Sequence, residues 1–145
     1  MGVELRRVDK DSWYSVCRLA VNDSQEMFVA PNSFSLAQAA YEADTCPMGI
    51  YADGRLAGFL MWNYDSRLGG WGMCRLMVDR KYQRRGIGRQ AVERLLETVR
   101  REKGRIPFYV SVSRENEVAI RLLRGVGFEE TGKNWGEEKL MRVEL

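Results

Sequence analysis

The sequence predicts an α/β (α+β) fold in a single domain, residues 1–145, with a mixed, mostly antiparallel sheet of about six to seven strands flanked by about four helices. Three observations carry this prediction. Apolar residues recur every four positions from Ile87 onward, as in a helix with one buried stripe. Asp53-Gly54 separates two apolar runs and indicates a β-hairpin. Apolar and polar residues alternate over 107–113, which indicates a strand.

The first part of the chain predicts a strand at residues 3–8, followed by two helices. Asp9 or Asp11 can cap the first helix, because a carboxylate there accepts hydrogen bonds from the free N–H groups of a helix start. Its apolar residues share one face, which we expect to be buried: Trp13, Val16, Cys17 and Ala20. After a proline-containing break, the Ser-Leu-Ala-Gln run that begins at Ser35 has the pattern of a capping box. It predicts a second helix that ends near Asp44.

The rest of the chain combines strands with two further helices. The strands are expected at residues 48–52, 55–63, 71–79, 107–113, 128–131 and 138–145. One helix begins at Gly86 and stops at Gly104, and the other is capped by Asn116 and ended by Gly125 or Gly127. The order is therefore βαα, three antiparallel strands, αβαβ and a last strand.

The composition indicates a soluble globular protein, because 45% of the residues are hydrophobic and 30% are charged. A net charge of +3 is too small to indicate nucleic acid as a partner. The absence of histidine excludes Ser-His and Cys-His hydrolases and metals held by histidine. The cysteines are isolated and form no C-x-x-C pair, which predicts a cytoplasmic protein with reduced thiols and no bound metal. No apolar run reaches membrane length, so we expect no membrane partner.

Basic residues and glycines meet at the start of the helix that follows Gly86. The first N–H groups of a helix have no partner within it, and together with the helix dipole they favour an anion. Gly86 and Gly88 let a phosphate approach the backbone closely and let the loop adopt positive φ. Arg84, Arg85 and Arg89 add permanent positive charge. A plain glycine turn would account for the glycines, but the three arginines around them favour a pocket for a pyrophosphate.

Two other nucleotide motifs compete for the same residues. The run from Gly86 to Ala91 fits the dinucleotide pattern G-x-G-x-x-A, which needs an acidic residue about 20 positions later to hold a ribose. No Asp or Glu lies between Glu102 and Glu115, and no Lys-Ser/Thr pair follows the glycines as a P-loop requires. The pattern that fits is Q-x-x-G-x-G, which begins at Gln83 directly after the predicted strand and its turn.

This Q-x-x-G-x-G run resembles the acetyl-CoA signature of the GNAT superfamily of N-acetyltransferases. The order of the predicted elements is also similar to that superfamily's fold, and residues 116–128 resemble its N-x-x-A-x-x-L marker followed by G-F. Within the superfamily, the sequence most resembles bacterial spermine/spermidine (diamine) acetyltransferases, over residues 75–88, the Asn116 helix and the tail 136–141. The resemblance implies a GNAT-type fold and an acetyl-CoA-dependent N-acetyltransferase.

The resemblance also implies where acetyl-CoA binds. The backbone of Leu76, Met77 and Val78 would hydrogen-bond the pantetheine arm, and a main-chain N–H there would polarise the thioester carbonyl. Asn116 would contact the pantetheine from the other side. The pyrophosphate would be held by the loop and helix start, namely Arg84, Arg85, Gly86, Ile87, Gly88 and Arg89. The amine would attack directly in a ternary complex, so positioning supplies much of the rate.

The general acid and base remain unassigned. Many members carry a tyrosine that protonates the departing thiolate, and Leu123 stands at that position here, where it cannot donate a proton. Some members place a glutamate base on the strand before the cofactor loop, and the corresponding residue is Cys74. Tyr109 and Tyr82 are the other catalytic candidates, and water can carry the proton if no side chain does.

The region around the second helix is locally acidic and compatible with a cationic acceptor. Glu26 and Glu42 are its candidate substrate-binding residues, although a solvated helix face would also explain these charges. The first hypothesis for the small-molecule acceptor is a polyamine such as spermidine or spermine. An amine antibiotic or a protein N-terminus are alternatives within the same reaction.

Two interpretations from other functional classes also stay open. Leu123 is compatible with a non-catalytic acyl-CoA-binding or regulatory module. The literal G-x-G-x-x-A run is compatible with a nicotinamide-binding protein. Dimers are common in the superfamily, which makes a homodimer a further candidate partner. Trp135 could lie at such an interface or line the acceptor site.

Overall fold

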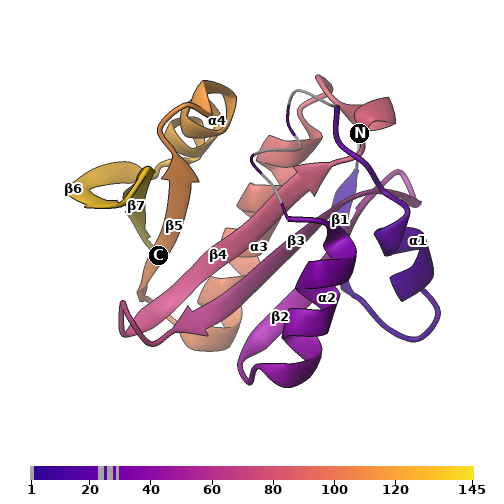
Figure 1. Ribbon diagram of the computed structural model, residues 1–145, viewed down its shortest axis with the longest axis horizontal. Helices are drawn as coiled ribbons and strands as arrows, with labels where there is room; N and C mark the ends of the chain where they lie inside the picture. The colour runs from indigo at the N-terminus through magenta and orange to yellow at the C-terminus, as the bar shows by residue number, and fades with distance from the viewer. Residues whose placement is uncertain (1, 23–24, 26–27, 29) are drawn as a thin grey trace.

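The computed structural model describes residues 2–22, 25, 28 and 30–145, and its strands form one seven-stranded sheet in the order β1-β2-β3-β4-β5-β7-β6 (Figure 1). The strands are β1 (Val3–Arg7), β2 (Thr45–Ala52), β3 (Arg55–Asp65), β4 (Gly70–Val78), β5 (Pro107–Ser113), β6 (Glu129–Trp135) and β7 (Glu138–Glu144). The β4–β5 pair is parallel and the other neighbouring pairs are antiparallel. This mixed, mostly antiparallel sheet confirms the predicted fold class.

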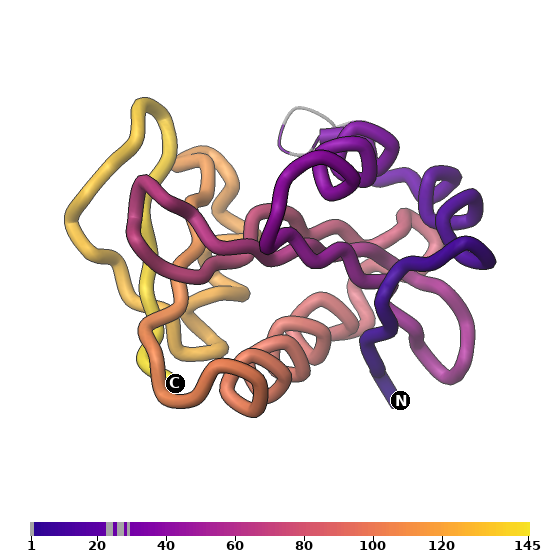
Figure 2. The backbone as a smooth tube through the Cα atoms, turned by 90° about the horizontal axis from the view of Figure 1, so that it is seen from below, coloured from indigo at the N-terminus to yellow at the C-terminus, as the bar shows by residue number. Residues whose placement is uncertain are grey.

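Helices cover both faces of the sheet. They are α1 (Trp13–Cys17), α2 (Asn32–Tyr41), α3 (Ile87–Lys103) and α4 (Glu117–Val126), with the short 3-10 helix η2 (Arg80–Tyr82) between β4 and α3. Figure 2 shows α1 and α2 on one side of the sheet and α3 on the other. None of the helices formed by the described residues is long and apolar enough to cross a membrane.

The core has two layers, and β3 contributes to both because successive side chains of a strand point to opposite faces. Leu60 and Trp62 are buried in the cluster that includes the apolar stripe of α3. Phe59 and Met61 are buried on the opposite face, in a cluster with Val16 of α1. The predicted stripe of α3 is confirmed, because Ile87, Ala91, Leu95 and Val99 are all buried.

Local signals predicted most element boundaries correctly. Asp53 and Gly54 form the β2–β3 turn with φ of 50° and 83°, the left-handed conformation that a two-residue hairpin requires. Gly86 precedes α3 at φ 75°, and Gly104 ends it at φ 84°. Asn116 caps α4, since its side chain accepts a hydrogen bond from the Ala119 N–H at 3.2 Å.

The predicted capping box at Ser35 is wrong. Helix α2 begins one turn earlier, at Asn32, and the carbonyl of Pro31 accepts the N–H of Ser35 at 3.2 Å. The reason is tertiary, because Ser35 is fully buried and its hydroxyl accepts a hydrogen bond from Arg75 instead of capping a helix. The helix also ends at Tyr41, before the predicted Asp44, because Glu42 is extended.

Of the four residues predicted to form the buried face of the first helix, one is buried. Val16 is buried, whereas Trp13 is 51% exposed, Cys17 is half-buried and Ala20 lies exposed beyond the helix end. Helix α1 spans five residues, so little more than one turn faces the sheet.

Candidate active site

A cavity of about 370 Å³ lies where β4 and β5 separate. The two strands pair over Trp71–Met73 and Phe108–Val110, and in the described part of the chain no pairing continues beyond these residues. Residues 72–76 of β4 and 109–113 of β5 therefore form two walls of the cavity. The start of α4, through Asn116 and Ala119, lines its end, and Leu140 of β7 lines its far side.

A β-bulge redirects β4 at the cavity wall. Arg75 lies opposite Met61, but Met73 lies opposite Trp62, so Cys74 is an extra residue without a partner on β3. Bulges commonly occur beside active sites, because they reorient the side chains and main-chain groups that follow. The main-chain groups of Leu76, Met77 and Val78 lie beyond this bulge, on the part of β4 that has separated from β5.

The loop before α3 contains two residues in the left-handed conformation, which is common in backbone loops that bind anions. Gly86 adopts left-handed φ, and so does Arg84 at φ 64°. The first backbone N–H groups of α3 point out of the helix start, where a pyrophosphate would be held. Gln83 ties this loop to the end of β4, since its Nε2 donates to the Val78 carbonyl at 2.9 Å. The residues present therefore fit a phosphate group.

Gly88 also has a packing role, in addition to the one its motif predicts. A Cβ at this position would lie 3.2 Å from Leu122 Cδ1 and 3.6 Å from Val78 Cγ2. Gly88 therefore permits α3 to pack closely on α4 and β4. Of these two glycines, Gly86 is the one that adopts positive φ.

The three arginines predicted to bind phosphate differ from one another in their surroundings. Arg84 and Arg85 are exposed, and the Arg85 guanidinium lies 5.7 Å from the Tyr82 ring. Arg89 instead donates from Nη2 to the Gly125 carbonyl at 2.9 Å, which links α3 to the end of α4. In this structure the Arg89 side chain thus stabilises the helix pair, while its backbone N–H remains at the helix start.

The N-cap of α4, Asn116, lines the cavity together with Ala119 and Leu123 of the helix. Asn116 uses its side-chain oxygen for the helix cap, which leaves its NH₂ group as a donor. Leu123 is 2% exposed and contributes an apolar side chain to the cavity wall. No hydroxyl is therefore available at that point of the wall.

The structure separates the three catalytic candidates. Tyr109 and Cys74 both line the cavity. Tyr82 lies in η2 and lines a different cavity, which it shares with Arg85 and the β2–β3 hairpin. The Tyr109 ring packs over Gly70, where a Cβ would lie 3.1 Å from its Cε2.

Burial makes Cys74 a weak acid. It raises the pKa of the Cys74 thiol to about 11, with Glu42 and Asp65 contributing in the same direction and the neighbouring Arg75 opposing them. The Sγ also donates a hydrogen bond to the Met61 carbonyl at 3.4 Å. The thiol is therefore protonated at neutral pH, which disfavours a role as general base.

Alkylation of Cys74 is expected to be slow at neutral pH. A thiol with a pKa of about 11 is thiolate in roughly 0.03% of molecules at pH 7.5, against roughly 10% for a free cysteine. The rate with iodoacetamide should thus rise about tenfold per pH unit up to pH 11. Mass spectrometry of the Cys74 peptide measures this rate, with the urea-unfolded chain as control. A rate that levels off near pH 8.5 would contradict the assigned environment.

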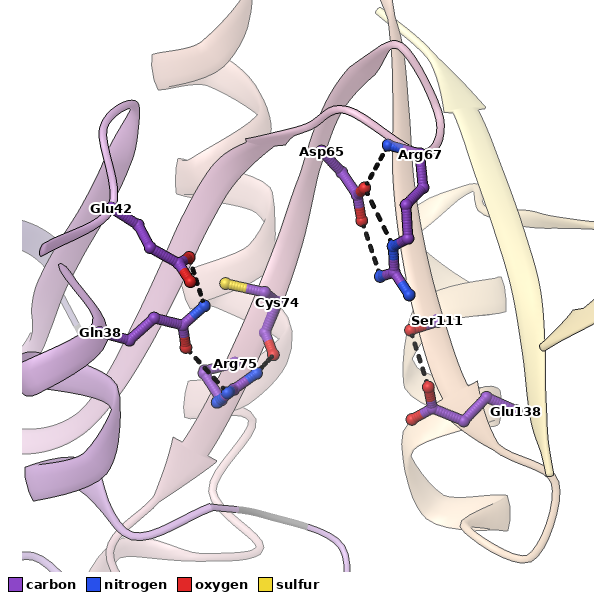
Figure 3. A network of polar contacts seen from close by, with 8 residues as sticks. All are labelled: Gln38, Glu42, Asp65, Arg67, Cys74, Arg75, Ser111 and Glu138. Carbon is purple, nitrogen blue, oxygen red and sulfur yellow. Dashed lines mark hydrogen bonds and ion pairs between the residues drawn. The ribbon is translucent and has the colours of Figure 1, made fainter. Parts of the chain in front are cut away.

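Polar side chains gather on both sides of the cavity in Figure 3, and sequence reasoning missed most of them. On the α2 side, the Arg75 guanidinium donates to Ser35 Oγ at 3.1 Å and to Gln38 Oε1 at 3.0 Å. Gln38 in turn donates to Glu42 Oε2 at 2.9 Å. These bonds hold α2 against the bulge of β4.

On the opposite side, Arg67 is paired with Asp65, and Glu138 accepts a hydrogen bond from Ser111 Oγ at 3.2 Å. All four residues line the cavity, as does Trp135. Trp135 therefore lies in the wall of the cavity, which is one of its two predicted placements. No local pattern identifies these residues, because they come from β3, its following turn, β5, β6 and β7.

Glu42, one of the two predicted acceptor carboxylates, is not part of this wall. Glu42 lies at the C-terminal end of α2 and reaches the cavity indirectly, through Gln38 and Arg75. Glu26 lies outside the residues that the structure describes. Among the described residues, the carboxylates that line the cavity are Asp65 and Glu138.

Residues 9–128 match the model of the acetyltransferase (GNAT) family. The spermine/spermidine N(1)-acetyltransferase of Bacillus subtilis (strain 168) is 26% identical over 152 residues, which cover 100% of both chains. This confirms the resemblance to bacterial polyamine acetyltransferases.

Solved structures share the fold. The spermidine N-acetyltransferase from Vibrio cholerae, in complex with CoA and spermine, has a TM-score of 0.76 at 18% identity, over 98% of this chain and 95% of that one. The PaiA N-acetyltransferase from Thermoplasma acidophilum, in complex with coenzyme A, has a TM-score of 0.71 at 16% identity, over 100% of both chains. With the matching family model and the divergence of β4 and β5, these similarities lead to one conclusion: the chain belongs to the acetyltransferase (GNAT) family, whose acetyl donor is acetyl-CoA.

Proposed function

We propose that this protein transfers the acetyl group of acetyl-CoA to a primary amine of a small polycation, with spermidine or spermine as the first candidates. The observation that carries the proposal is the cavity between β4 and β5, with two carboxylates in its wall, Asp65 and Glu138. The wall also contains Arg67 and Arg75, but Arg67 is paired with Asp65 and Arg75 is hydrogen-bonded to α2. Glu138, which forms no ion pair among the described residues, therefore favours a cationic acceptor. The full-length similarity to a spermine/spermidine acetyltransferase supports the same class of acceptor.

The donor's arm would lie in the gap between β4 and β5. In this proposal the main chain of Leu76, Met77 and Val78 binds the pantetheine from one side and the Asn116 amide from the other. The pyrophosphate is held at the start of α3 by residues 84–89. Acetyl-CoA supplies the activated acetyl group, and the chain contributes positioning and a main-chain N–H directed at the developing oxyanion.

The acceptor amine must lose a proton before it attacks, because an alkylammonium group has a pKa near 10. Tyr109 is the candidate that both lines the cavity and has a hydroxyl. Cys74 is disfavoured as a base by its raised pKa, and Tyr82 lies beside the other cavity. Water carries the proton where these groups do not.

A cytoplasmic location is part of the proposal. Cys17, Cys46 and Cys74 are free thiols, as expected in a reducing compartment.

A non-catalytic acyl-CoA-binding module is the second candidate function. Leu123 is the observation that favours it, because this apolar side chain occupies the part of the wall where family members carry the proton-donating tyrosine.

The test is release of free CoA thiol from acetyl-CoA with spermidine, spermine, simple diamines, an aminoglycoside and an N-terminal peptide as acceptors. We expect turnover with the polyamines. The double variant Arg84→Ala/Arg85→Ala should raise the KM for acetyl-CoA about 10- to 100-fold. A charge-assisted hydrogen bond to phosphate contributes about 1.5–3 kcal/mol, and exposed arginines such as these contribute less than the full amount.

The matched control is Arg100→Ala/Arg101→Ala, which removes the same charge from the last turn of α3. It should leave the KM for acetyl-CoA unchanged. If the enzyme acetylates only the aminoglycoside or only the peptide, that compound is the acceptor and the polyamine proposal is wrong. If acetyl-CoA raises the melting temperature but no amine releases thiol, the non-catalytic module is the correct function.

A further inference from the structure

Arg67 places its own positive charge inside the candidate acceptor site. It lies in the turn between β3 and β4, and its guanidinium donates to Asp65 from Nε at 3.3 Å and from Nη2 at 3.0 Å. The same guanidinium lies over the Trp135 ring, 4.3 Å from its centre. A carboxylate and an aromatic face therefore hold one cation between them, which is a recurrent way of binding an ammonium group.

A second carboxylate faces this cation. Figure 3 shows the Arg67 guanidinium directed toward Ser111 and Glu138. Asp65 raises the pKa of Arg67 most, and Glu138 contributes in the same direction. Among the described residues Glu138 forms no ion pair, and its carboxylate accepts the Ser111 hydroxyl instead. The site thus has more negative charge than Arg67 alone neutralises.

The guanidinium can leave this site at little cost. The Arg67 side chain is 71% exposed, whereas that of Asp65 is 19% exposed. Ion pairs with one solvent-exposed partner are weak, and a long arginine side chain can rotate into water. The Arg67 backbone N–H also donates to Asp65 Oδ1 at 2.9 Å, so the carboxylate keeps this contact when the guanidinium moves away.

We propose that Asp65, Trp135 and Glu138 form the subsite for a distal ammonium group of the acceptor, and that Arg67 occupies this subsite until the acceptor displaces it. The inference rests on the proposed function, because it concerns an acceptor with more than one positive charge. Arg67 then acts as an internal competitor. It weakens the binding of every acceptor that needs the subsite and does not affect amines that lack a second charge.

The test compares spermidine with n-butylamine, which has a single ammonium group. Discrimination is measured as the ratio of their kcat/KM values in wild type, Arg67→Ala and Arg67→Lys. Removing the competitor should raise this ratio about three- to tenfold in Arg67→Ala, mainly through a lower KM for spermidine. Arg67→Lys keeps a cation and should stay near the wild-type ratio. Asp65→Asn and Trp135→Leu should lower the ratio by a similar factor.

The control variant is Arg101→Ala, which removes one positive charge at the far end of α3 and should not change the ratio. Calorimetric titration of spermidine into wild type and Arg67→Ala gives a second readout that does not depend on turnover. One outcome would overturn the subsite but not the proposed function. In it, the wild-type protein acetylates spermidine, and Arg67→Ala changes neither the ratio of kcat/KM values nor the affinity for spermidine. A wild-type protein that neither binds nor acetylates spermidine would overturn the proposed acceptor, and the inference with it.

Discussion

The Gly72→Ala variant is expected to lose about 1–3 kcal/mol of its free energy of unfolding, the usual cost of forcing an extra methyl group into a packed site. A Cβ at Gly72 would lie 2.6 Å from the Tyr109 carbonyl oxygen and 3.2 Å from its carbonyl carbon. These are backbone atoms of the paired strand β5, so they cannot move without disturbing the short β4–β5 pairing. That pairing connects β1–β4 to β5–β7.

Urea denaturation followed by circular dichroism measures this loss. The matched control is Gly125→Ala in the last turn of α4, where the new Cβ would meet the flexible end of Arg89 at 3.3 Å. Alanine is a better helix former than glycine, so this variant should be neutral or slightly more stable. Equal stability of Gly72→Ala and wild type would show that β4 and β5 are not held at this distance.

The Leu123→Tyr variant is expected to raise kcat for the acetylation of spermidine by about tenfold. A well-placed general acid contributes about 10²–10⁴-fold, and a newly introduced phenol should recover part of it. Leu123 lines the cavity, so a hydroxyl extended from this position would enter the space in which we propose that the thioester lies. The larger ring should cost about 1–3 kcal/mol of stability, because Leu123 is also part of the buried core.

Leu123→Phe is the matched control, since it has the same ring without the hydroxyl. Both variants should lose similar stability, and the gain in kcat should appear in Leu123→Tyr alone. The phenol must be protonated to act as an acid, so the gain should be present below pH 10 and disappear as the pH rises through the tyrosine pKa. Equal kcat values for the two variants would show that proton donation at this position does not limit the reaction.

Features that depend on neighbouring residues could be predicted from the sequence alone. The stripe of α3, the Asp53-Gly54 hairpin and the Asn116 cap each follow from side chains within a few positions of one another. The proposed anion site belongs to the same group, because the N–H groups of a helix start and the arginines beside them are contiguous in the chain. Together with the family resemblance, these features predicted the fold and the cofactor.

The proposed acceptor end of the site depends on contacts that form only in the folded protein. Asp65, Arg67, Trp135 and Glu138 meet because β4 diverges from β5 and the β6–β7 pair folds back toward the turn after β3. The start of α2 was missed for a related reason, since the Ser35 hydroxyl bonds to Arg75 of a distant strand. Contacts between segments 40 to 70 residues apart leave no period or spacing in the sequence, because their energy depends on the assembled sheet and not on local conformation.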